Sequence, residues 1–149
     1  MSERKPTPEQ KQIVYDRAAG CCEYCFSRAD HSPSPFAAEH ILPRHSGGTN
    51  ALSNLALSCQ GCNNHKFTSM EALDPGSGIV APLFHPRRNA WHEHFSWDEN
   101  YSIIVGRTPM GRATVNRVQL NRPSVVNLRR VLRRDGKHPP GFVSKAKKE

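Results

Sequence analysis

Four cysteines stand in two pairs with the spacing of metal ligands. Cys22 and Cys25 form the first C-x-x-C pair, and Cys59 and Cys62 form the second after an interval of 33 residues. Four thiolates on two tight turns suit tetrahedral zinc, and four protein ligands leave no open coordination position. The pattern predicts a structural zinc site, with reduced core cysteines as the alternative. Cys21-x-x-x-Cys25 fits a tight turn less well, so we expect Cys21 to be a free thiol.

The interval between the cysteine pairs contains more polar chemistry than a zinc ribbon needs. Zinc ribbons separate their pairs by about 15–20 residues, whereas this longer segment contains Glu39, His40, His45 and Asn54. Histidine is the side chain best suited to accept a proton near neutral pH, which makes His40 a candidate general base. The alternative is a surface histidine without a catalytic role. Glu39 and, after the last cysteine, Asn63 offer the oxygen ligands that Mg²⁺ prefers.

Taken together, these motifs resemble the HNH endonucleases of the His-Me finger group. The resemblance covers about residues 21–70, and a later stretch from APLFHPRRNAW to LNRP looks like the extension of small stand-alone members. It implies a ββα-metal core and metal-dependent hydrolysis of DNA. The matching pattern comprises CEYC (22–25), EHILPRHSGG (39–48), Asn54-Leu55 and CQGCNNHK (59–66), with 14 residues from His40 to Asn54 and nine from Asn54 to Asn63.

The resemblance also implies a role for each polar residue of the core. His40 would be the general base, and Asn54 would fix its direction by bonding to the backbone around it. The alternative for Asn54 is that it only stabilises its own turn. Glu39 and Asn63 would hold one catalytic Mg²⁺ or Mn²⁺, separate from the structural zinc. Glu39 replaces the more frequent Asp, and Asn63 replaces the final His of the HNH name. The amide oxygen of Asn is a poorer ligand than imidazole for soft transition metals.

Basic residues near the motif and in the C-terminal part are candidate phosphate contacts. His65 lies two residues after Asn63, about 200° around a helix, so we expect it to point away from the catalytic metal and to contact DNA or nothing. His92 and His94 alternate along a predicted strand without a carboxylate-rich motif, so we expect structural roles for them. The candidate DNA contacts are Arg44, His45, His65, Lys66, and, on the outward face of a helix, Arg129, Arg130, Arg133 and Arg134.

Hydrophobic periodicity and turn residues predict how the chain positions these groups, in an α+β fold whose core is stapled by zinc. The expected domains are 1–20 (tail and helix), 21–70 (nuclease core), 71–128 (α+β extension) and 129–149 (basic helix end and tail). In the first 73 residues, the expected elements are a helix from a Thr7–Gln10 capping box to Gly20, strands at 37–42 and 55–58, and a helix after Cys62. They are followed by an extended connector at 74–90 and a hairpin of EHFSW and YSIIVG. Two further helices are expected, one from Thr108 to about Leu120 and one from Pro123 onward.

The net charge of +8 is concentrated at the C-terminal end. Residues 129–149 contain eight Lys or Arg residues against Asp135 and Glu149, which accounts for +6 of the total. Such a concentration indicates a polyanionic partner, with double-stranded DNA as the first candidate and an anionic membrane surface as the second. A solubilising tail is the alternative. No apolar run is long enough for a membrane span and the N-terminus has no apolar signal core, so we expect a cytoplasmic protein.

The sequence therefore favours a metal-dependent DNA endonuclease. The main alternative is a zinc-stabilised DNA-binding module without catalytic activity, which would bind DNA and leave it intact. A third possibility is a redox or metal-sensing protein whose binding depends on the Cys21 thiol. The pair Glu39-His40 together with Asn54 favours the enzyme over both alternatives.

Overall fold

A computed structural model describes residues 5–141, which form two compact units. The first unit extends to Met70 and also includes His85–Arg88, and the second comprises Glu71–Phe84 and the chain from Asn89 onward. Helices alternate with three small antiparallel sheets in the described residues, so the predicted α+β class is confirmed. The first four residues of the predicted N-terminal tail and the tail lysines Lys145, Lys147 and Lys148 lie outside the described residues.

The first unit begins with helix α1 (Pro8–Arg17), whose start is the predicted capping box. The Thr7 side chain accepts a hydrogen bond from the backbone N–H of Gln10, and the Gln10 side chain accepts one from Thr7 in return. Three short 3₁₀ helices follow in the loops of this unit: η1 (Ala29–His31), η2 (Arg44–Ser46) and η3 (Leu52–Asn54). These caps and turns provide hydrogen bonds for backbone N–H and C=O groups that have no partner within the helices.

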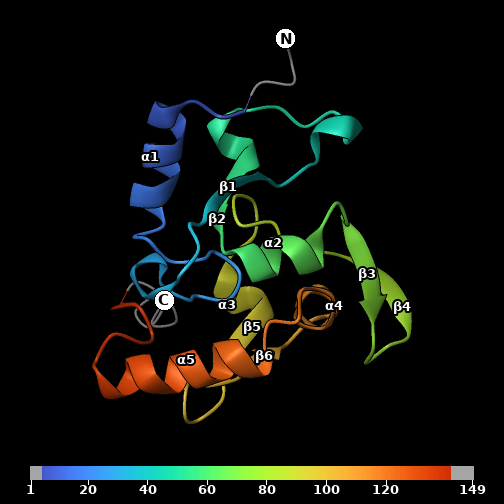
Figure 1. Cartoon of the computed structure of the whole chain (residues 1–149). Coiled ribbons are helices and arrows are strands. Elements are labelled where there is room, and N and C mark those ends of the chain that lie inside the picture. Colours follow the sequence, from blue (N-terminus) through green and yellow to red (C-terminus); the bar gives the residue numbers. More distant parts are fainter. Residues whose placement is uncertain (1–4, 142–149) are drawn as a thin grey trace. The chain divides into compact units, whose positions relative to one another are not determined.

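Strands β1 (Ala37–His40) and β2 (Leu55–Ser58) form the sheet of the first unit. They pair antiparallel, with Glu39 opposite Ala56 and His40 opposite Leu55, and they lie side by side in Figure 1. All four residues of β2 are buried, so this strand is covered on both faces. Its core contacts include two residues of α1. The cluster consists of Val14, Ala18, Leu55 and Leu57, with Phe36, Ala38 and Leu52 packed against it.

Helix α2 (Gln60–Lys66) is the helix predicted after Cys62, but it starts earlier than the sequence indicated. Cys59 is its N-cap, because the Sγ atom accepts a hydrogen bond from the backbone N–H of Cys62. The helix ends at Phe67, whose φ of 52° and ψ of −126° are incompatible with helical continuation. The chain then turns into a strand at Glu71.

The second unit opens with a hairpin that replaces part of the predicted extended connector. Strands β3 (Glu71–Asp74) and β4 (Ile79–Pro82) pair antiparallel. The turn between them is held by the Asp74 carboxylate, which accepts hydrogen bonds from the Gly76 backbone and the Ser77 hydroxyl, and Gly78 adopts a φ of 76°. The connector prediction is therefore wrong for 74–82, because Asp and Gly at fixed turn positions outweigh the Pro and Gly content of the segment.

The remaining elements of the second unit agree more closely with expectation. A short helix α3 (Trp91–His94) precedes the confirmed hairpin of β5 (Phe95–Trp97) and β6 (Ile104–Gly106). Helix α4 (Pro109–Val118) is capped by the Thr108 side chain, and helix α5 (Pro123–Arg134) starts at the predicted proline. His92 and His94 lie in α3, not on a strand as predicted. Their contacts are structural: His92 meets the edge of Trp91, and His94 Nδ1 lies 2.7 Å from the Thr108 hydroxyl.

The Arg129 side chain is buried, which corrects the expectation that all four arginines of α5 face outward. Only 1% of Arg129 is exposed. Its guanidinium donates hydrogen bonds to the carbonyls of Ser102 and Leu120 and to Asn121 Oδ1, at 2.8, 2.6 and 3.0 Å. It also lies 5.4 Å from the centre of the Trp97 ring. Arg129 therefore joins α5 to the loops around β6 and is not available to contact DNA.

None of the helices within residues 5–141 is long and apolar enough to cross a lipid bilayer.

Replacement of Arg129 by alanine is expected to lower the free energy of unfolding by about 2–6 kcal/mol. The buried carbonyl oxygens of Ser102 and Leu120 lose this donor, and each unsatisfied group costs about 1–3 kcal/mol, whereas Asn121 Oδ1 keeps the hydrogen bond from the Ile104 N–H. Urea unfolding followed by tryptophan fluorescence measures the effect. The matched control is the exposed neighbour in Arg130→Ala, for which we expect a change within about 0.5 kcal/mol. Equal losses in the two variants would contradict the structural role of Arg129.

Candidate active site and metal centre

The four paired cysteines come together at one buried point. Their Sγ atoms all lie within 4.8 Å of one another, and among the residues that the structure describes this is the one group of three or more His, Cys, Asp or Glu side chains positioned to hold a metal. The Sγ atoms of Cys25 and Cys59 are 3.7 Å apart. Four thiolates about 2.3 Å from a tetrahedral zinc ion are about 3.8 Å from each other. The cluster of Cys22, Cys25, Cys59 and Cys62 is therefore compatible with zinc.

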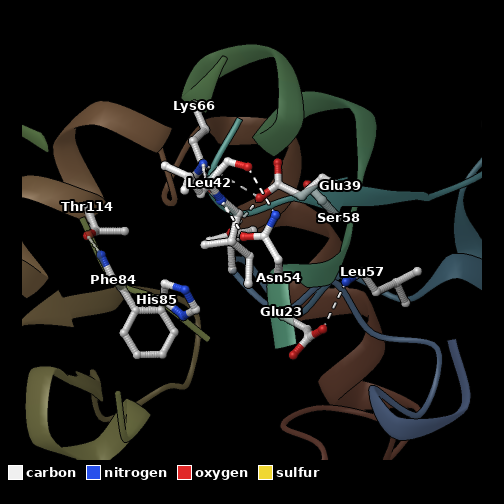
Figure 2. A network of polar contacts seen from close by, with 12 residues as sticks. Glu23, Glu39, Leu42, Asn54, Leu57, Ser58, Lys66, Phe84, His85 and Thr114 are labelled. Atoms are coloured by element: carbon white, nitrogen blue, oxygen red, sulfur yellow. Dashed lines mark hydrogen bonds and ion pairs between the residues drawn. The ribbon is translucent and has the colours of Figure 1, made fainter. Parts of the chain in front are cut away.

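Two local interactions bring the first cysteine pair against β2 and the second pair. The backbone N–H of Glu23 donates to the carbonyl of Leu57, and the Glu23 carboxylate accepts from the Leu57 N–H at 2.9 Å (Figure 2). The second oxygen of Glu23 pairs with Arg87. Burial raises the pKa of the Cys22 thiol, whereas hydrogen bonds from the other cysteines lower that of Cys59. A bound cation would be needed to keep all four as thiolates.

Cys21 lies outside this cluster, as predicted. Its side chain is buried, and its Sγ donates to the carbonyl of Ala19 at 3.6 Å. Its backbone forms an isolated bridge with Arg28. Burial raises the pKa of the Cys21 thiol, so the nucleophilic thiolate is disfavoured at neutral pH.

Asn54 closes the loop that follows β1. Its Oδ1 accepts from the backbone N–H of Leu42 at 2.8 Å, and its Nδ2 donates to the carbonyls of Leu42 and Thr49 at 3.1 and 2.9 Å. Figure 2 shows this amide directed at the Leu42 backbone. The Asn54 carbonyl accepts a further bond from the Ile41 N–H at 2.8 Å. Asn54 thus extends the pairing of β1 and β2 beyond their last regular residues.

Gly48 leaves room for this arrangement. A Cβ atom at position 48 would lie 1.7 Å from the Leu42 carbonyl oxygen and 2.9 Å from Asn54 Nδ2. A Cβ contact of this length with backbone cannot be relieved without moving the loop. The GG pair in the sequence is therefore required at its second position by close packing against Leu42.

His40 is the last residue of β1, and its ring is fixed by a partner that the sequence did not reveal. Its Nε2 atom lies 2.6 Å from Asn50 Oδ1. An amide oxygen only accepts hydrogen bonds, so in the neutral ring Nε2 carries the proton and Nδ1 carries the lone pair. Asn50 therefore sets both the orientation and the tautomer of the His40 imidazole.

Glu39 points into the protein, where its carboxylate has two partners. It is 6% exposed, it accepts a hydrogen bond from the Tyr24 hydroxyl at 2.5 Å, and its Oε2 lies 3.8 Å from the Lys66 ammonium. Burial raises the pKa of Glu39, while Lys66 and the Tyr24 hydroxyl act in the opposite direction. Both contacts use Oε2, so the second carboxylate oxygen keeps its acceptor positions for another ligand.

A cleft of about 520 Å³ in the first unit is lined by the candidate base and both candidate ligands of the catalytic metal, but not by Asn54. Glu39, His40 and Asn63 line it together with Arg44 and Phe67. This volume lies within the range of small-molecule sites, about 300–1,000 Å³. The remaining lining residues are Ala37, Ala38, Pro43, Asn64 and Thr68.

The predicted phosphate contacts fall into three groups. Arg44 lines the cleft, and His45 and His65 are exposed. Lys66, in contrast, is 2% exposed and donates to the Ile41 carbonyl at 3.2 Å, so its assignment as a phosphate contact is corrected to a structural one. On the second unit, a groove of about 680 Å³ is lined by Arg130, Arg133 and Arg134 with Asn100, Asn127 and Val131.

Asn50 and Tyr24 were missed at the sequence level, for different reasons. Asn50 lies ten residues after His40 in a polar loop, where an asparagine is equally typical of a turn. Tyr24 lies inside the first cysteine pair, and nothing in the spacing of that pair points to Glu39. An asparagine within reach of a candidate base is a signal that could have indicated the first of these contacts.

Residues 22–68 match a family model described as HNH endonuclease. The matched segment contains the four clustered cysteines and also Glu39, His40, Asn54 and Asn63, so the predicted resemblance is confirmed for this segment. Neither a search of curated proteins nor a search of solved structures finds a match. The family match supports a nucleic acid as the partner of the first unit.

The purified protein is expected to contain one zinc ion, and the Cys59→Ser variant is expected to lose it. Removal of a ligand opens the tetrahedron, and structural zinc contributes about 10–16 kcal/mol in small zinc domains. Metal analysis by mass spectrometry and circular dichroism before and after chelation measure both effects. Cys21→Ser is the matched control, because Cys21 lies outside the cluster. Loss of zinc in Cys21→Ser but not in Cys59→Ser would show that the ligand set is wrong.

Proposed function

Because residues 22–68 match the HNH endonuclease family model, we propose that this chain is a metal-dependent endonuclease that hydrolyses DNA phosphodiester bonds in the cleft of the first unit. The observation that carries the proposal is the placement of His40 and Asn63, from different elements, in the same cleft. A candidate base and a candidate metal ligand are thereby available to one substrate group.

His40 is the proposed general base. The Nε2–H group is hydrogen-bonded to Asn50 Oδ1, so the lone pair of Nδ1 is the one that accepts a proton from the attacking water. Asn54 and Gly48 are positioning residues, because they fix the loop that begins where β1 ends. The imidazole is therefore oriented before substrate binds, which reduces the rearrangement needed in the transition state.

Glu39 and Asn63 are the proposed ligands of the catalytic ion in a ββα-metal core formed by β1, β2 and α2. A carboxylate and an amide oxygen suit a hard cation that keeps several water ligands. Both side chains line the cleft, which supports this assignment. Held by these two residues, a Mg²⁺ or Mn²⁺ ion would supply positive charge beside the phosphate and its leaving oxygen.

The groove on α5 is the proposed source of additional phosphate contacts. Arg130, Arg133 and Arg134 are exposed, and within residues 5–141 no carboxylate lines the groove with them. Arg133 lies 4.6 Å from the centre of the Tyr101 ring, which limits its motion. Contacts with phosphate groups are electrostatic and do not depend on the base sequence of the DNA. Binding to double-stranded DNA should therefore weaken as the salt concentration rises.

A zinc-stabilised DNA-binding module without catalysis is the second candidate. The observation in its favour is the Glu39 carboxylate, which is already engaged by Tyr24 and Lys66 inside the protein. In this case the cleft would bind DNA without assembling a catalytic metal site. The two candidates differ in whether metal-dependent cleavage occurs.

Supercoiled plasmid incubated with the protein and Mg²⁺ or Mn²⁺ is expected to be nicked or linearised, and EDTA should prevent this. His40→Ala should lower the cleavage rate at least about 100-fold, because a positioned general base contributes about 10²–10⁴-fold. His45→Ala is the matched control and should keep the cleavage rate at saturating plasmid, since His45 is exposed in the same loop and its ring bonds to the Ser46 hydroxyl. Binding of intact plasmid without cleavage under every metal condition would favour the second candidate.

Asn63→Ala is expected to raise the Mg²⁺ concentration needed for half-maximal cleavage about tenfold or more, because an oxygen ligand of the ion is lost. The zinc content should stay at one ion per chain. His65→Ala is the matched control on the same helix, and its metal dependence should be that of the original protein. A larger effect in His65→Ala than in Asn63→Ala would show that the ligand has been misassigned.

A further inference from the structure

Phe67 is a large aromatic side chain that the protein leaves in water. It is 71% exposed, the highest fraction among the large apolar side chains of the described residues. A single exposed apolar residue is common and needs no special reason. Two further features of Phe67, its backbone conformation and its position, distinguish it from an ordinary surface residue.

The backbone of Phe67 is strained. Its φ of 52° and ψ of −126° belong to a region that glycine adopts readily and that residues with a Cβ atom rarely adopt. The conformation is imposed where α2 ends, and the Phe67 N–H bonds to the Asn63 carbonyl at 2.9 Å. A phenylalanine here gains little from burial, so folding alone gives no reason for an aromatic residue at a position that favours glycine.

Phe67 also lines the cleft that contains His40 and Asn63. Arg44 lines the same cleft, and its guanidinium suits a phosphate group. An apolar ring beside groups that suit a phosphodiester matches the mixed chemistry of a nucleotide, with a charged backbone and a flat base. Phe67 is the C-cap of α2, the helix that presents Asn63, and its N–H bonds to the Asn63 carbonyl.

We infer that Phe67 stacks on an unpaired nucleobase next to the scissile phosphate. This inference rests on the proposed nuclease function and specifies its substrate as DNA with an accessible base, such as single-stranded, gapped or locally opened DNA. A base within a continuous duplex is covered on both faces by its neighbours, whereas an unstacked base can stack on an aromatic side chain.

Binding is tested with a gapped oligonucleotide that carries 2-aminopurine at the unpaired position, in the His40→Ala background so that the DNA stays intact. Stacking on Phe67 should quench the 2-aminopurine fluorescence. Phe67→Ala should abolish the quenching and weaken binding about 5- to 150-fold, the range corresponding to loss of one stacked base. Phe67→Trp should retain both, and Met70→Ala, which removes another exposed apolar side chain, should change neither.

Phe67→Gly separates a binding role from a structural one. Glycine relieves the backbone strain, so the melting temperature of the zinc-loaded protein should rise by a few degrees. Binding of the gapped oligonucleotide should fall as it does in Phe67→Ala. A lower melting temperature in Phe67→Gly together with unchanged binding would show that Phe67 serves the fold, and the inference would be wrong.

The outcomes for Phe67 and for the nuclease function are distinguishable. If the original protein cleaves gapped DNA and Phe67→Ala binds and cleaves it equally well, only the stacking inference is wrong. If the protein binds and quenches the oligonucleotide but never cleaves DNA, the stacking inference stands and the catalytic proposal is wrong. If duplex and gapped DNA bind with equal affinity and without quenching, the substrate class inferred from Phe67 is wrong.

Discussion

The meeting of two cysteine pairs is the constraint on which the rest of the first unit depends. The apolar cluster of this unit is small, with Val14, Ala18, Leu55 and Leu57 as its buried residues. Bringing Cys22 and Cys25 against Cys59 and Cys62 forces the chain between them to leave and return, and it does so as the antiparallel pair β1 and β2. The same closure places the start of α2 beside the end of the sheet, because Cys59 caps that helix. The cleft is thus a geometric result of the cysteine cluster.

The alternation of side chains along β1 explains why the base and the carboxylate have such different surroundings. Neighbouring residues of a strand point to opposite faces, so Glu39 faces Tyr24 and Lys66 while His40 faces the loop that contains Asn50. Both reach the same cleft because β1 ends at His40 and the chain bends there. The buried Lys66 then has a clear electrostatic reason, since it compensates a carboxylate that has been removed from water.

Sequence alone predicted features that depend on local chemistry and fixed spacing. The α1 capping box and the α5 start follow from residues within a few positions of each other, and the cysteine cluster follows from two pairs that each have the spacing of metal ligands. Prediction from the sequence failed where a contact between residues distant in the chain determines the structure. The outward face of α5 is broken by Arg129, whose hydrogen-bond acceptors lie up to 27 residues away in the chain. The hairpin at Asp74 was missed because turn residues were read as a connector, and the Asn50 contact with His40 has no periodic signal.

The return of His85–Arg88 to the first unit has a consequence for where that unit can be separated from the rest of the chain. Arg87 pairs with Glu23, and Glu23 is the residue that attaches the first cysteine pair to β2. A fragment ending at Met70 would keep every cysteine of the cluster and yet leave one oxygen of this half-buried carboxylate without its cation. The first unit is therefore discontinuous in sequence, and the segment 71–84 is an insertion within it.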